Sequence, residues 1–194
     1  VVYDPYQTLK MEGSVLALVK DGVSVTDVDA GDEVDVILPA TCFYVESGGQ
    51  VSDSGWIRGL DGSWEIEVRE VRKPAAGIIV HRGKVTRGQP QVDDLSSAVV
   101  DDARRRDIMR NHTATHLLHA ALTSVLGGHA RQAGSLVAPD HLRFDFTHPE
   151  GMSAQQLEQV EAQVNRAILE NHRLNITIKP LAQAMDEGST ALFG

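Results

Sequence analysis

The stretch from Asp94 to Gly128, DLSSAVVDDARRRDIMRNHTATHLLHAALTSVLGG, separates two kinds of hydrophobic pattern. Before it, short alternating or apolar runs are punctuated by Gly, Asp and Pro, which is typical of antiparallel strands and turns. From Leu95 the apolar period becomes helical, with Asp94 or Ser96 as the expected N-cap and Gly127-Gly128 as the stop. The sequence therefore predicts an α+β protein whose first half is all β.

The first half, residues 1–93, is expected to form a small antiparallel β-barrel. A closed barrel is the economical arrangement because closure removes exposed sheet edges. The candidate strands are Gly13–Val19, Val34–Leu38, Trp64–Val71 and Ile78–His81.

The second half, residues 94–194, predicts a two-layer α/β domain with helices packed on one side of an antiparallel sheet. A second helix begins at a capping box formed by Ser153 and Gln156. Its apolar stripe consists of Leu157, Val160, Val164 and Ile168. The other expected elements are strands at Gly134–Val137, Leu142–Phe146 and Leu174–Ile178 and a short helical turn at Ala182–Met185.

Length and composition are those of a globular protein: 194 residues, of which 42% are hydrophobic and 23% charged. No apolar run approaches the roughly 18 residues that cross a bilayer, and the N-terminus lacks the pattern of a signal peptide. These features favour a soluble cytoplasmic protein. The single cysteine, Cys42, excludes an internal disulfide framework and is expected to be a small buried hydrophobe. Because the chain starts without Met and ends on Leu192-Phe193-Gly194, we expect it to be part of a longer protein.

The net charge of −9 restricts contact with nucleic acid, because phosphate binding depends on Lys and Arg. Any such contact must be local. The candidate nucleic-acid contacts are Arg104-Arg105-Arg106 with Arg110, and the scatter of Arg69, Arg72, Lys73, Arg82, Lys84 and Arg87. The alternative interpretation of each basic cluster is a solvated surface without a partner.

His112 and His116 lie four residues apart in the predicted helix and share one of its faces. Imidazoles one turn apart can bind one metal ion, and zinc takes four ligands or three and a water. Ordinary helix histidines are the alternative, since a chain with 8 histidines often contains such a pair by chance. Helical phase places both, with His119, away from the apolar face, which favours a cleft. No Glu follows the first His, so the metalloprotease form of the motif is absent.

A second polar feature is Phe43–Gly55, FYVESGGQVSDSG. The paired glycines allow positive φ or a close approach of the backbone to a ligand, while Glu46, Gln50 and Asp53 supply polar groups. A hairpin turn between two strands is the alternative interpretation.

Together and in this order, the two features resemble the editing domain of alanyl-tRNA synthetases and their free-standing editing relatives. Phe43–Gly55 is similar to the glycine-rich motif of that family, and His112-x-x-x-His116 is similar to its first metal motif. Threonyl-tRNA synthetase editing domains share the histidine motif but lack the preceding barrel with its glycine loop. Further similar stretches are His129–Val137, Leu142–Phe146 and Ala191–Gly194.

The resemblance implies a zinc pocket that hydrolyses serine or glycine from wrongly charged tRNA(Ala), because binding discriminates poorly between small side chains. The parent activity would be ATP-dependent charging of tRNA with alanine, with the rest of the synthetase chain as a partner. His112 and His116 would be zinc ligands. The implied catalytic residues are Gln132, Gly48, Gly49 and Gln50, and the implied substrate-binding residues are Glu46, Ser47, Asp53, Arg104 and Arg110.

One departure from the family concerns the metal site. In the family a Cys-x-x-x-His pair downstream of the Ala-Leu-Phe-Gly stretch completes the zinc site; this sequence does not include it, and Cys42 does not match it. Two imidazoles alone should bind zinc weakly, so the chain alone is expected to be inactive or impaired. Two alternatives stay open: a non-catalytic module for the tRNA acceptor end, with steep salt dependence, and a metal-dependent hydrolase of small substrates, active without tRNA.

Overall fold

The computed structural model describes residues 1–189 and divides the chain into two compact units. The first contains Val1–His112 and Leu136–Leu142, and the second contains Thr113–Ser135 and the chain from Arg143 onward. This division differs from the predicted boundary between residues 93 and 94. The reason is that strand β10 (Leu95–Val100) pairs inside the sheet of the first unit.

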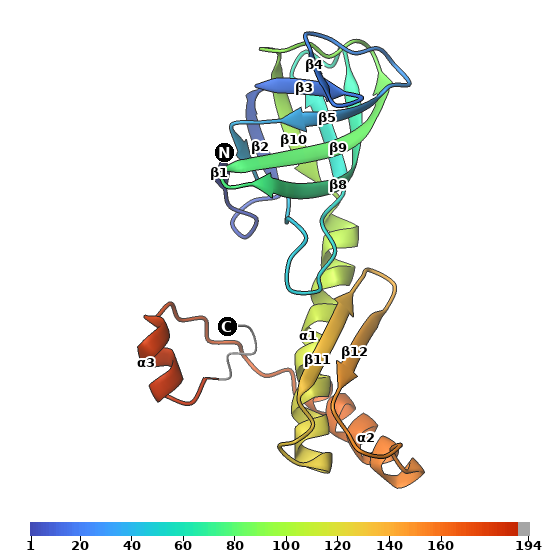
Figure 1. The fold of residues 1–194 in the computed structure, drawn as a ribbon, viewed down its shortest axis with the longest axis vertical. Coiled ribbons are helices and arrows are strands. Elements are labelled where there is room, and N and C mark those ends of the chain that lie inside the picture. The colour runs from blue at the N-terminus through green and yellow to red at the C-terminus, as the bar shows by residue number, and fades with distance from the viewer. Residues whose placement is uncertain (190–194) are drawn as a thin grey trace. The chain divides into compact units, whose positions relative to one another are not determined.

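The first unit is built on an eight-stranded sheet with the order β2-β10-β7-β8-β9-β5-β3-β4, in which all neighbouring strands run antiparallel (Figure 1). A separate parallel pair joins β1 and β6. The strands are β1 (Val2–Tyr3), β2 (Lys10–Ser14), β3 (Ala17–Lys20), β4 (Val23–Val25), β5 (Glu33–Ile37), β6 (Ala40–Thr41), β7 (Gly55–Gly59), β8 (Glu65–Ala75), β9 (Ile78–Arg87) and β10.

The predicted closed barrel is not found. The sheet curls, but β2 and β4 are its two end strands and no strand pairing within residues 1–189 joins them. Closure is not needed to protect these edges, because β4 is only three residues long and β2 carries the charged, exposed Lys10 and Glu12. The α+β class and the antiparallel sheet are confirmed.

The core of the first unit lies inside the curl of the sheet. Alternation in the strands accounts for it: in β8, Ile66 and Val68 are buried while their neighbours Glu65 and Glu67 face outward. The largest fully buried side chain is Phe43, from the glycine loop. Cys42 is also fully buried, as the sequence predicted.

Helix α1 (Asp102–Leu126) begins later than predicted. The segment from Leu95 is strand β10, because it pairs with both β2 and β7 and buries Ala98 and Val100 in the core. Asp101 precedes the helix and caps it: its carboxylate accepts a hydrogen bond from the Arg104 N–H at 3.1 Å. The helix ends at Leu126, directly before the predicted stop at Gly127, whose φ is 103°.

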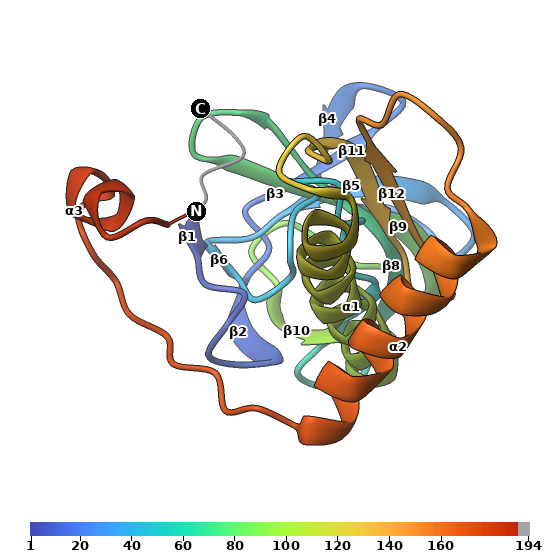
Figure 2. The same cartoon turned by 90° about the horizontal axis from the view of Figure 1, so that it is seen from below.

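The second unit combines the later part of α1 with β11 (Gln132–Val137), of which residues 132–135 belong here, β12 (Leu142–Phe146) and helix α2 (Ala154–Glu170). Helices α1 and α2 lie side by side (Figure 2), and Ala121, Leu122 and Val160 form the buried centre of this unit. The capping box of Ser153 and Gln156 is confirmed. Only the middle of the predicted stripe is buried, since Leu157 and Ile168 are both 53% exposed.

The C-terminal part of the described chain contains one regular element, α3 (Leu181–Asp186), which confirms the predicted helical turn. Leu174–Ile178, predicted as a strand, has no regular structure, and its apolar side chains are exposed. The alternation is present there, but no strand within residues 1–189 pairs with it. Ala191–Gly194, part of the family resemblance, lies outside the described residues. Within residues 1–189, none of the helices is both long and apolar enough to cross a membrane.

Candidate functional site: the glycine loop and the histidine helix

The glycine loop is a tight hairpin turn. Ser47 and Gln50 exchange both backbone hydrogen bonds, at 3.3 and 3.0 Å, and Gly48 and Gly49 occupy the two central positions with φ of 60° and 83°. Positive φ at both central residues is the type I′ arrangement, which favours glycine. The hairpin interpretation is therefore correct for the backbone.

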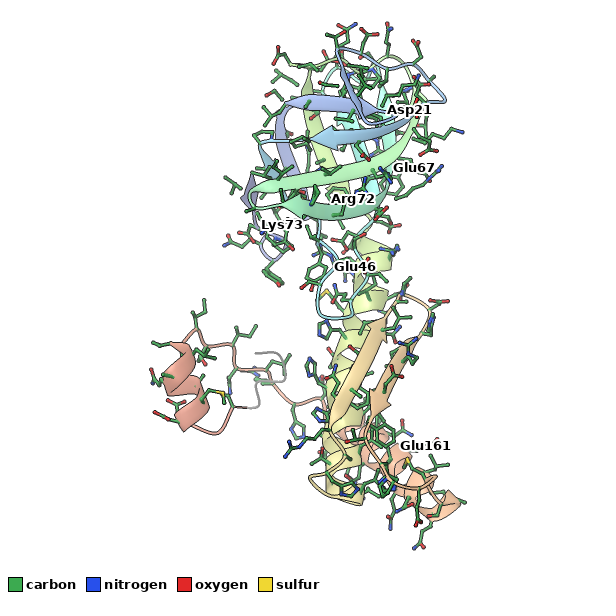
Figure 3. The ribbon with its side chains drawn as sticks, viewed as in Figure 1. Asp21, Glu46, Glu67, Arg72, Lys73 and Glu161 are labelled. Atoms are coloured by element: carbon green, nitrogen blue, oxygen red, sulfur yellow. The ribbon has the colours of Figure 1, made fainter. Side chains whose placement is uncertain are left out.

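The end of strand β11 (Gln132–Val137) fixes the loop on its other side. The Val51 N–H donates to the Val137 carbonyl at 3.1 Å, and the Val137 N–H donates to the Gly49 carbonyl at 2.8 Å. Gln50 consequently sits between two anchored neighbours and is only 6% exposed. Glu46, by contrast, projects from the loop into solvent (Figure 3).

The structure brings the glycine loop against the histidine helix, and one of the contacts between them joins the two chemical features. The Gln50 Oε1 lies 2.5 Å from the His112 Nδ1, and both residues belong to the first unit. An amide oxygen accepts hydrogen bonds and does not donate them, so His112 donates from Nδ1. The neutral imidazole then carries its lone pair on Nε2.

A buried ion pair joins the same loop to the first turn of α1. The Arg105 Nε donates to the two Asp53 carboxylate oxygens at 2.8 and 2.9 Å, and the pair is nearly inaccessible to solvent. Arg105 also donates to the carbonyls of Pro5 and Cys42, while the Tyr44 N–H donates to Asp53 at 2.6 Å. Burial lowers the pKa of Arg105, but the hydrogen bond and charge of Asp53 outweigh it and raise that pKa.

This ion pair changes the interpretation of two residues. Asp53, predicted to bind substrate, has its carboxylate engaged inside the protein, where it holds the loop against the helix. Arg105, grouped in the sequence with surface arginines, is a buried structural residue. The sequence signal for the burial of Arg105 is the apolar Ile108, which lies three residues later on the same helix face. In the structure Ile108 is fully buried.

Tyrosine hydroxyls add to the anchoring of the loop. The Tyr3 hydroxyl accepts a hydrogen bond from the Val45 N–H at 3.2 Å, and the Tyr44 hydroxyl donates to the Ser47 carbonyl at 3.3 Å. Burial raises the pKa of both phenols. Both hydroxyls are therefore protonated at neutral pH and act as neutral hydrogen-bonding groups.

His112 and His116 both lie in α1, His112 half-buried and His116 exposed. Two neutral imidazoles fit half of a zinc ligand set, and a hydrogen-bonded Nδ1 is the usual arrangement for a metal-ligating histidine. Within the described residues, no group of three or more His, Cys, Asp or Glu side chains is placed to hold a metal ion. Burial raises the pKa of the Cys42 thiol to about 11, so it is a poor source of the thiolate that zinc requires.

His119 lies next to the core of the second unit and not in a polar cleft. Its ring centroid is 5.2 Å from that of Phe144. Gln132, also in the second unit, donates from its side-chain amide to the Ser135 hydroxyl at 3.1 Å. The structure thus places Gln132 at the start of β11, oriented by a side chain three residues further along.

The predicted basic clusters are largely neutralised by acidic partners. Arg72 and Arg82 both pair with Asp35, at 3.0 and 2.7 Å, and Arg72 lies on β8 beside the exposed Lys73 (Figure 3). Arg110 pairs with Asp107. Similar pairs join Arg69 to Glu33 and Glu67 and Arg106 to Asp102, while Arg104 donates to the Ser52 carbonyl.

Comparison with known proteins places the chain. The family model for class II (A) tRNA synthetases matches residues 3–104, just over half of the sequence. The chain belongs to this family of class II tRNA synthetases. The matched region contains the whole glycine loop and Arg105's immediate neighbour Arg104, and it ends before His112.

Curated relatives of this class II synthetase chain are alanine–tRNA ligases. The ligase of Desulforamulus reducens is 46% identical over 189 residues, which is 97% of the chain and 21% of that ligase. The ligase of Herpetosiphon aurantiacus is 49% identical over the same shares, and that of Pelotomaculum thermopropionicum is 48% identical over 100% of the chain and 22% of the ligase. The chain therefore spans about a fifth of the length of these relatives.

Proposed function

We propose that this chain is the editing portion of an alanine–tRNA ligase. In this proposal the chain serves, within the full-length protein, to hydrolyse the ester that links serine or glycine to tRNA(Ala), and the full-length protein charges tRNA(Ala) with alanine using ATP in the cytoplasm. The observation that carries the proposal is the contact between Gln50 and His112, because it joins the glycine loop to the histidine helix. Each feature alone can be explained as a structural element, a hairpin turn or ordinary helix histidines. Their contact is what favours a shared catalytic site.

The chemistry required is attack of water on an ester carbonyl. We propose His112 and His116 as two of the zinc ligands; bound zinc would polarise the carbonyl or lower the pKa of the attacking water. The backbone N–H groups of Gly48 and Gly49 are our candidates for donors to the oxyanion that develops on the carbonyl oxygen. Gln132 is the candidate for contact with the amino acid.

The remaining predicted residues take supporting roles. Glu46 and Ser47, both exposed on the loop, are candidates for contact with the terminal nucleotide, as are Arg104 and Arg110 of α1. Asp53 is a positioning residue, because Arg105 and Tyr44 already occupy its carboxylate.

The proposal is tested by His116→Ala in the full-length native protein, with His172→Ala as a control that removes another exposed histidine of the second unit. We expect His116→Ala to abolish most hydrolysis of Ser-tRNA(Ala) and to lower the zinc content while alanine charging persists. The control should change neither activity. Loss of alanine charging with hydrolysis intact would instead place the chain in the charging machinery.

A non-catalytic module for the tRNA acceptor end is the second candidate, and the pairing of its basic residues weakens it. Arg69, Arg72 and Arg82 each contact a carboxylate. A binding module should hold tRNA with an affinity that falls steeply as salt increases. We expect this chain by itself to bind tRNA(Ala) barely at low ionic strength, which a filter-binding titration measures.

A further inference from the structure

Gln50 differs from the other polar side chains at the tip of the glycine loop. Glu46 and Ser47 are exposed, whereas Gln50 is 6% exposed and its Oε1 lies 2.5 Å from the His112 Nδ1. A side chain in this position is poorly placed to touch a substrate. It is well placed to act on His112.

The backbone around Gln50 is held at three points. Its N–H donates to the Ser47 carbonyl at 3.0 Å, its carbonyl accepts from the Ser47 N–H at 3.3 Å, and the next residue donates to the Val137 carbonyl at 3.1 Å. The type I′ turn and this bridge fix the direction in which the Gln50 side chain leaves the chain. The acceptor is therefore positioned before any ligand arrives.

The contact has a chemical consequence for His112. An imidazole that donates from Nδ1 presents the Nε2 lone pair, and an imidazole that donates from Nε2 cannot bind a metal through that atom. Metal-ligating histidines are commonly oriented by an oxygen acceptor on their other nitrogen, and loss of that acceptor weakens metal binding 10- to 100-fold. Glutamine supplies such an oxygen without adding charge.

We propose that Gln50 is a positioning residue that fixes His112 as the Nδ1–H tautomer and so makes Nε2 the metal-binding atom. The metal-binding part of this assignment rests on the proposed function, which supplies the zinc. The tautomer itself can be measured without metal. The Gly48-Gly49 turn then has a structural role in addition to its proposed catalytic one, because the turn positions Gln50.

The test compares Gln50→Met, which keeps the length of the side chain and removes its oxygen, with Gln50→Glu, which keeps an oxygen. Gln89→Met is the matched control, because Gln89 is exposed and remote from His112 in the sequence and its amide bonds Asp27. The ring nitrogens of His112 in the metal-free chain are assigned by ¹⁵N NMR at about pH 8, above the usual imidazole pKa. Zinc affinity is measured in the full-length native protein by chelator competition.

We expect the Nδ1–H tautomer in the unsubstituted chain, in Gln50→Glu and in Gln89→Met, and a mixture of tautomers in Gln50→Met. Zinc affinity should fall about 10- to 100-fold in Gln50→Met alone. An Nε2–H ring in the unsubstituted chain, or the same tautomer and zinc affinity in Gln50→Met, would overturn the assignment. If the tautomer responds as expected while the unsubstituted full-length protein neither binds zinc nor hydrolyses Ser-tRNA(Ala), the positioning role stands and the proposed function fails.

Discussion

At the scale of single residues, Gly48 offers a test of the loop that separates backbone strain from function. Gly48 and Gly77 have similar positive φ values, 60° and 75°, and an added Cβ would meet nothing within 4 Å at either site. Alanine at either position should therefore cost a similar roughly 1–2 kcal/mol of unfolding free energy. We expect only Gly48→Ala to slow hydrolysis of Ser-tRNA(Ala) in the full-length protein.

Chemical denaturation of both variants and a deacylation assay measure this pair. Equal loss of hydrolysis in Gly48→Ala and Gly77→Ala would mean that the effect comes from general destabilisation and not from the loop.

His81 carries a pH dependence of stability. It is fully buried, and the pKa of its imidazole is lowered by burial from 6.5 to about 4. Its Nε2 bonds the Thr41 hydroxyl at 2.8 Å, and its Nδ1 lies 3.2 Å from the Val36 carbonyl. Because the unfolded chain binds a proton at higher pH than the folded one, protonation favours unfolding as pH falls below 6.5.

The expected loss of stability approaches about 3 kcal/mol when the pH reaches 4, at about 1.4 kcal/mol for each pKa unit. Urea unfolding between pH 7 and 5, above the range in which most carboxylates titrate, measures the effect. His81→Gln should flatten the curve over this interval. An unchanged slope in that variant would show that other groups cause the pH dependence.

At the scale of elements, the contact between the glycine loop and the start of α1 depends on Arg105. Replacing Arg105 by Met leaves the Asp53 carboxylate buried without its cation, and breaking a buried pair costs about 3–5 kcal/mol. Arg106→Met is the matched control, since Arg106 pairs with Asp102 on the surface and its loss should cost at most about 1 kcal/mol.

Denaturant unfolding measures the contribution of the buried ion pair to the unfolding free energy. The variants compared are Arg105→Met, Arg106→Met and the double variant Arg105→Met with Asp53→Leu. The double variant should recover part of the loss, because it removes the uncompensated charge. Similar small losses in both single variants would mean that Asp53 is hydrated in solution.

At the scale of the whole molecule, the two units differ in the size of their cores. Strands of the first unit surround an extended apolar core, whereas the buried core cluster of the second, within the described chain, consists of Ala121, Leu122 and Val160. Local opening costs less where fewer apolar contacts are buried. We therefore expect amide hydrogens of residues 113–126 in α1 to exchange faster than those in the core strands β8 and β9.

Hydrogen exchange followed by mass spectrometry tests this difference. Amides of residues 102–112, in the same helix but in the first unit, serve as the internal control and should exchange more slowly than those of residues 113–126. Uniform protection along α1 would contradict the division into two units of unequal stability.

Sequence by itself determined the features that depend on neighbours along the chain. Alternation predicted the antiparallel sheet, the capping box at Ser153 located α2, and the glycine loop and the histidine pair were recognised as the two chemical features. Such features follow from local periodicity, capping and turn chemistry. Their direct contact through Gln50 and His112 could not be read from spacing.

Tertiary structure alone decided how distant segments pair. It made Leu95–Val100 a strand because β2 and β7 lie on either side of it, and within residues 1–189 it left Leu174–Ile178 without a strand partner despite the alternation of that segment. It buried Arg105 because Asp53 lies opposite. In each case the free energy comes from hydrogen bonds and charges between residues far apart in the sequence, which no local pattern records.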